Sequence, residues 1–233
     1  MSLMHSIAHQ PASLLELARD ALTYPIRGSG KWILLTCAVL SIIADIVMFA
    51  PMLGFFAWVL ICAYFCAIYV DLIQSTANGE KDAPHFPETS NLMTDVIWPY
   101  MQVIFIFLIS FSPLILCPLL IGTPNTLVLI ALSALGCAYF PMGMLAVVMC
   151  GTLWAANPIR VIPSIFRVGG LYLLAVLLLI GLYFAEVQLL EMQGGGMIKN
   201  TLIMALTGPY VFMANARILG IIWRERREDL GWF

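Results

Sequence analysis

The sequence predicts an all-α membrane protein: a polytopic bundle of about six transmembrane helices arranged as three hairpins, with amphipathic helices in the membrane interface. Hydrophobic residues make up 62% of the chain and charged residues only 10%, whereas a water-soluble domain carries about a quarter charged residues. The apolar residues also form continuous runs, not the alternating pattern of a membrane β-strand. Both observations favour helices that cross a bilayer.

Six apolar runs are long enough to cross about 30 Å of hydrocarbon, which takes about 20 residues of helix. They cover residues 32–50, 55–73, 96–120, 126–150, 169–190 and 200–223. The first two runs are separated by "PMLG", and the third and fourth by "IGTPN". Gly, Pro and Asn in such short segments predict tight turns. The membrane bundle is therefore expected to span residues 32–223.

A polar or amphipathic segment precedes each predicted hairpin. In the first, "SLLELARDALTYP", Ser13 and Glu16 fit a capping box, and apolar residues recur on one helical face. The second is "ETSNLMTDVIWP" and the third "WAANPIRVIPSIFRVGG". These segments predict interfacial helices and a weak threefold repeat of helix plus hairpin.

Lysine and arginine orient the predicted bundle. With the N-terminus in the cytoplasm, ten of the eleven basic residues fall on or near the inner side, and only Lys199 falls outside. Residues 1–31 then form a cytoplasmic amphipathic segment, residues 224–233 a cytoplasmic tail, and residues 74–94 the one sizeable hydrophilic loop. Both termini are expected in the cytoplasm, and the protein is expected to expose little on the far side.

Arg217 is predicted near the inner edge of the last span. Counted from Thr201 at 1.5 Å per residue, it lies about 24 Å down, about 6 Å short of the end of the hydrocarbon. Two interpretations stay open. The side chain could extend to the interface as an anchor, or it could form an ion pair with Asp71, which reaches a similar depth in the second span.

Asp45 and Glu186 are the candidate intramembrane proton or cation site. Asp45 is the deepest predicted charge, about 20 Å from the start of the first span, and a charge near the bilayer centre costs about 2.5–3.5 kcal/mol. Its carboxyl group is either neutral and structural, or it faces a water-filled cavity. Glu186 lies nearer the outer surface, where it could extend to the interface. If the first and fifth spans pack together, however, the two carboxyl groups would form a pair that binds a proton or cation.

Other chemical signals favour structural roles. The six cysteines all fall in predicted spans, where packing without disulfides is expected, and His5, His9 and His85 fall in segments exposed to solvent. The sequence contains no nucleotide-binding, zinc-protease or nucleophile-elbow motif. We therefore expect no cofactor, no metal and no catalytic residues. The tail interleaves arginines with acidic residues, so nucleic acid is not an expected partner.

The stretch "NGEKDAPHFPE", the entry "DVIWPYMQ" to the third span and the ending "ARILGIIWRERREDLGWF" resemble an uncharacterised family of prokaryotic multi-pass proteins, domain of unknown function 4013. The pattern more distantly resembles Yip1-type proteins, which typically have five spans. The first resemblance implies a prokaryotic inner or plasma membrane. It implies no activity.

Two functions remain as hypotheses. The first is a non-enzymatic membrane protein that scaffolds or modulates other membrane components through its cytoplasmic face, with the lipid bilayer and a membrane protein or a second copy of the chain as partners. The second is a small proton- or cation-linked transporter or channel that uses Asp45 and Glu186. Minimal outer turns and amphipathic entry helices support the first, whereas the intramembrane carboxyl groups and proline-interrupted spans support the second.

Overall fold

Every regular element in the described part of the chain is a helix. The computed structural model describes residues 14–48, 50, 52–80, 82, 84, 86, 91–122, 124–170, 172, 173, 175–177, 180, 181, 188 and 197–232. The all-α prediction is therefore confirmed for these residues.

The N-terminal part, as described from residue 14, contains four helical elements. They are α1 (Leu14–Thr23), the 3₁₀ turn η1 (Tyr24–Ile26), α2 (Gly30–Val47) and α3 (Leu53–Ala77). Pro25 within η1 has its φ fixed by the ring and lacks an N–H, which suits a short turn between two longer helices. The structure extends α3 to Ala77. The hydrophilic loop therefore starts about one turn later than residue 74, where the sequence predicted it.

The central part begins with the π-helical turn η2 (Met93–Ile97), which continues into α4 (Trp98–Ile121). It is followed by α5 (Thr126–Cys150), the 3₁₀ turn η3 (Leu153–Ala156) and α6 (Pro158–Val168). The side chain of Asn125 caps α5 by accepting from the N–H of Leu127. Gly151 ends α5 in the left-handed conformation that glycine adopts without steric cost.

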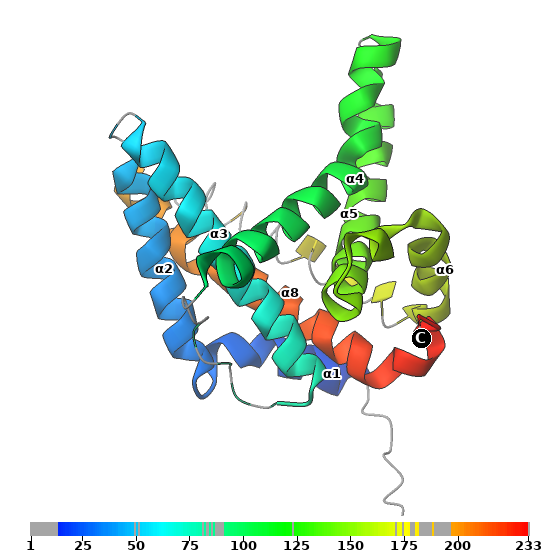
Figure 1. The fold of residues 1–233 in the computed structure, drawn as a ribbon, viewed down its shortest axis with the longest axis horizontal. Helices are drawn as coiled ribbons and strands as arrows, with labels where there is room; N and C mark the ends of the chain where they lie inside the picture. Colours follow the sequence, from blue (N-terminus) through cyan, green and yellow to red (C-terminus); the bar gives the residue numbers. More distant parts are fainter. Residues whose placement is uncertain are drawn as a thin grey trace, which may run out of the picture.

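The last element, α8 (Met197–Leu230), is the longest helix described. It packs against α1, α2, α3, α5 and α6. Its backbone leaves helical geometry at Arg226, where φ is −128° and ψ is 20°. The final turn is therefore redirected, and the C-terminus lies beside α6 (Figure 1).

Among the described residues, five helical segments are long and apolar enough to cross a membrane. They are Gly30–Val47, Leu53–Ala77, Met93–Leu120, Thr126–Cys150 and Asn200–Leu230. Each coincides with a predicted span, which supports an integral membrane protein. The remaining predicted span, residues 169–190, lies largely outside the described residues, so the count of six and the three-hairpin layout stay predictions.

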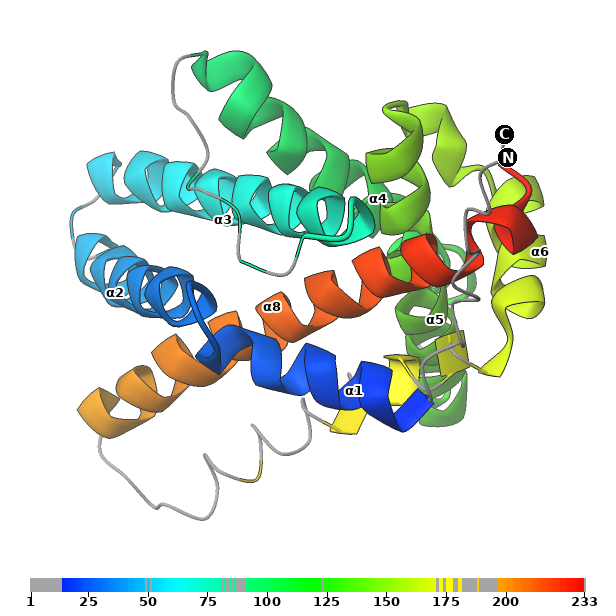
Figure 2. The same ribbon diagram turned by 90° about the horizontal axis from the view of Figure 1, so that it is seen from below.

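The two pairs α2–α3 and α4–α5 diverge from a common base. Helices within each pair pack against one another, and their tips point to opposite upper corners of Figure 1. α1 lies below them, alongside α8, as the view from below also shows (Figure 2). We call the surface formed by α1 and the C-terminal part of α8, which carries Arg217 and Arg224, the arginine-rich end.

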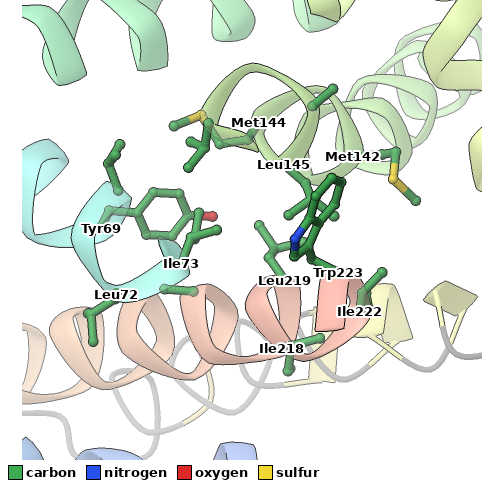
Figure 3. Close-up of a cluster of buried hydrophobic side chains, with 14 of the residues drawn as sticks. Tyr69, Leu72, Ile73, Met142, Met144, Leu145, Ile218, Leu219, Ile222 and Trp223 are labelled. Carbon is green, nitrogen blue, oxygen red and sulfur yellow. The ribbon is translucent and has the colours of Figure 1, made fainter. Parts of the chain in front are cut away.

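The main hydrophobic core lies where α3, α5 and α8 meet. Figure 3 shows side chains from all three helices around one centre. The labelled residues are Tyr69, Leu72 and Ile73 of α3, Met142, Met144 and Leu145 of α5, and Ile218, Leu219, Ile222 and Trp223 of α8. These side chains are buried, and between helices in lipid the stabilisation comes from close van der Waals packing. This core fixes α8 between the two helix pairs and so positions Arg217.

Candidate functional site

Arg217 of α8 connects four segments of the chain. Its Nε and Nη2 donate to Oδ2 of Asp20 at 3.1 and 3.0 Å, which joins α8 to α1. Its Nη1 donates to Oγ1 of Thr76 at 3.3 Å and to the carbonyl oxygen of Glu80 at 2.8 Å, beyond the end of α3. The side chain of Arg217 is 4% exposed and that of Asp20 40%. The guanidinium is thus enclosed by protein, while its counter-ion keeps contact with the surroundings.

The ring of Tyr24 completes the enclosure. The guanidinium carbon of Arg217 lies 4.5 Å from the centre of that ring, a cation–π distance. Burial raises the pKa of Tyr24 to about 12, although the Arg217 charge acts in the opposite direction. The phenol is therefore neutral at physiological pH. We call Arg217, Asp20, Tyr24, Thr76 and the Glu80 carbonyl the Arg217 junction.

The junction depends on a close approach of α3 and α8. A Cβ added to Gly220, almost one turn beyond Arg217, would lie 2.4 Å from the Cβ of Thr76 and 2.8 Å from the carbonyl oxygen of Ile73. Only glycine leaves room for this contact, as small residues do at many helix interfaces in membranes. A second hydrogen bond links α8 to α1: the hydroxyl of Tyr210 donates to the carbonyl oxygen of Leu22 at 2.7 Å.

Asp71 does not form the predicted ion pair with Arg217, and the partner is Asp20 instead. The reason is helical phase. Thr76, which bonds Arg217, follows Asp71 by five residues, so the two side chains point about 140° apart around α3. The prediction was based on the depth of each charge along its span. Depth does not define the direction in which a side chain points around the helix axis. Protein covers the guanidinium, and the interfacial position of Arg217 stays a prediction.

Asp71 instead faces a polar cavity of about 420 Å³ between α3, η2 and the start of α4. The cavity is lined by Val70, Asp71, Gln74, Thr94, Asp95, Trp98, Pro99, Gln102, Val148 and Gly151. We call it the acidic cavity, because Asp71 and Asp95 approach it from different helices. No basic side chain is among its described lining residues, so a bound cation would compensate two carboxylates.

Asp95 and Gln102 give this cavity its polar wall. Asp95 accepts at Oδ2 from the N–H of Asn91 at 3.0 Å and at Oδ1 from the hydroxyl of Thr94 at 2.7 Å. These bonds hold the carboxylate within the π-helical turn, a type of turn that recurs at functional sites. Gln102 is 5% exposed and buried beside the cavity. The arrangement can coordinate a small hydrated cation through carboxylate and amide oxygens.

Asp45 is exposed on α2, and it does not line the cavities of about 400, 220 and 420 Å³ that described residues form. Glu186 falls outside the described residues. The Asp45–Glu186 pair therefore stays a prediction. Ser41 lies about one helical turn before Asp45. It donates to the carbonyl oxygen of Cys37 at 2.9 Å and lines a small apolar cavity of about 220 Å³.

The thiols and histidines are not gathered into a metal site in the described part of the chain. All six cysteines are free, and the described residues include no group of three or more His, Cys, Asp or Glu that could hold a metal ion. His5, His9 and His85 lie outside the described residues, as does Ser13 of the predicted capping box.

The sequence interpretation missed Asp20, Thr76 and Tyr24 at the junction and Asp95 and Gln102 at the cavity. Gln102 could have been identified from the sequence, because an amide within an apolar span usually has a structural or functional partner. Asp20 could not, since 197 positions separate it from Arg217.

Comparison of the chain with known protein families, with curated proteins and with solved structures finds no match. The resemblance to domain of unknown function 4013 and to Yip1-type proteins stays a prediction.

Proposed function

We propose that the chain is a non-enzymatic integral membrane protein that scaffolds or modulates other membrane components through its arginine-rich end, which the basic residues predict to be cytoplasmic. The observation that supports this function is the Arg217 junction. One buried guanidinium holds α1 and the end of α3 on α8, so the junction presents a fixed surface. A preorganised surface binds a partner with a smaller loss of conformational entropy than a mobile one.

Site-specific photo-crosslinking in native membranes tests this function. Arg19 on α1 and Arg27 after η1 are exposed and can each be replaced by a photo-reactive amino acid. Leu127, 72% exposed at the opposite tip, serves as the control position. We expect a discrete protein adduct, with a membrane protein or a second copy, from positions 19 and 27 only. Equal adducts from all three positions, or lipid adducts alone, would contradict the proposal.

The junction itself supplies a second arm of this experiment. Replacing Arg217 with Met removes the bonds to Asp20, Thr76 and Glu80 together, which should free α1. We expect the α1 adduct to weaken in this variant if its amount in the membrane is matched to wild type. An adduct of unchanged strength would show that the held position of α1 does not matter for the partner.

A cation-linked transporter is the second candidate, supported by the acidic cavity. Two carboxylates and a buried amide line it, as a site for a proton or small cation would require. Flux in proteoliposomes tests this candidate with the variant Asp71→Asn/Asp95→Asn, and Glu228→Gln serves as a control in the exposed tail. Loss of flux in the double variant alone supports the cavity. Loss in Asp45→Asn instead supports the site predicted from Asp45 and Glu186.

A further inference from the structure

The helix α6 has three faces with different surroundings. Val161 and Val168 are buried against the bundle, and Ile159 and Phe166 are 83% and 79% exposed. At 100° per residue, the exposed apolar face lies about 160° from the buried face. A folded chain in water would not leave such a face uncovered, but a helix in the membrane interface places it among lipid tails.

Two arginines occupy the third face. Arg160 and Arg167 are seven residues apart, so they share one side of α6 about 10 Å apart along its axis. Between them a cavity of about 400 Å³ opens, bounded by the C-terminal turn of the chain. It is lined by Trp154, Asn157, Ile159, Arg160, Pro163, Arg167, Leu230, Gly231 and Trp232. No acidic side chain is among these described residues. We call this cavity the α6 pocket.

Hydrogen bonds hold the walls of the α6 pocket in place. Trp232 Nε1 donates to the hydroxyl of Ser164 at 2.7 Å, and Nη1 of Arg167 donates to the carbonyl oxygen of Leu230 at 3.3 Å. Asn157 caps the start of α6 by accepting from the N–H of Ile159 at 3.0 Å. The start of α6 is thus occupied by its own cap, and any attraction for an anion comes from the two arginines.

We propose that the α6 pocket binds a phosphate group, and that its source is the headgroup of an anionic phospholipid. A guanidinium donates to phosphate oxygens in a planar fork, and two of them on one wall match a singly or doubly charged phosphate. The adjacent exposed face of Ile159 and Phe166 fits the acyl chains of the same lipid. Trp154, which is 87% exposed, adds to this wall the residue type that is enriched at membrane–water interfaces.

Native mass spectrometry of the purified full chain tests the site. The protein is equilibrated with equal amounts of phosphatidylglycerol and phosphatidylcholine, and bound lipids are counted. We expect a preference for phosphatidylglycerol in wild type that falls about fivefold for each arginine lost in Arg160→Gln and Arg160→Gln/Arg167→Gln. The variant Arg19→Gln/Arg27→Gln also removes two exposed charges, but away from the pocket, and it should keep the preference.

The single variant Arg160→Gln distinguishes loss of the binding site from misfolding of the protein. Arg160→Gln leaves the bond from Arg167 to Leu230 intact, so it should keep the thermal stability of wild type while it loses lipid preference. A second arm measures inorganic phosphate by isothermal titration. Binding of phosphatidylglycerol alone identifies the source as lipid, whereas arginine-dependent binding of phosphate alone keeps the site and overturns the lipid as its source. Equal lipid preference in wild type, the pocket variants and the control, with no phosphate binding, overturns the proposal.

Discussion

Gly220 of α8 lies so close to Thr76 of α3 that a Cβ atom on the glycine would come within 2.4 Å of the Thr76 Cβ. The backbone carbonyl of Ile73 would also be 2.8 Å from that atom, and a backbone cannot move aside as a flexible side chain can. This contact brings the two helices near enough for Thr76 to accept a hydrogen bond from Arg217.

Replacement of Gly220 with Ala should therefore force α3 and α8 apart. We expect a loss of about 1–3 kcal/mol in unfolding free energy, the usual effect of overpacking, measured by thermal or denaturant unfolding in detergent. Gly170→Ala is the matched control, because a Cβ there meets no atom within 4 Å. Equal stability of the two variants would show that the close approach is not required.

Much of the fold was predictable because insertion into a bilayer depends on local composition. The run at 126–150 and the helix Thr126–Cys150 coincide, since a helix is the structure that satisfies every backbone group of a single span in lipid. Asn125 and the glycine at 151 mark its ends through local capping chemistry. Such signals act within a few residues, so sequence patterns reveal them.

The sites were less predictable because they depend on helix rotation and on long-range pairing. Depth along a span placed Asp71 and Arg217 at similar levels, yet the direction of Asp71 around α3 leads it to Asp95 and the acidic cavity. The partner Asp20 lies on a helix outside the spans. Apolar spans specify that helices cross the membrane, but the packing of α1 on α8 decides which charges meet.

Tyr24 should make stability depend on alkaline pH. Its folded pKa of about 12 lies above the usual value of about 10, so folding favours the neutral phenol. That contribution is fully present below pH 10 and is lost as the pH rises through 12. Wild type should thus lose stability relative to Tyr24→Phe between pH 10 and 12, as measured by thermal unfolding across this range.

The same variant tests the role of the ring. The hydroxyl of Tyr24 is buried without a hydrogen-bond partner among the described residues, so Tyr24→Phe at neutral pH should be neutral or slightly stabilising. Tyr24→Leu removes the ring beneath Arg217 and should lose about 1–2 kcal/mol of unfolding free energy. If Phe and Leu were equally tolerated, the contact between ring and guanidinium would have no measurable value.

The acidic cavity should contain water. We expect a water-soluble carbodiimide with an amine nucleophile to modify Asp71 in nanodiscs, and the Asp71→Asn variant to lack that modified site by mass spectrometry. The reason is that polar side chains line a cavity of about 420 Å³, which is large enough for several water molecules. Modification of Asp71 only after unfolding would identify a dry cavity and remove the support for the transport candidate.

The central claim is that Arg217 fastens α1 to the bundle through Asp20, and a double-mutant cycle tests it most directly. The variants Asp20→Ala, Arg217→Met and their combination are compared by unfolding free energy in mixed detergent, beside a second cycle with Asp71→Ala. The ion pair at 3.0 Å predicts a coupling of about 1–3 kcal/mol for Asp20 with Arg217 and a coupling near zero for Asp71. A larger coupling of Arg217 with Asp71 than with Asp20 would contradict the account.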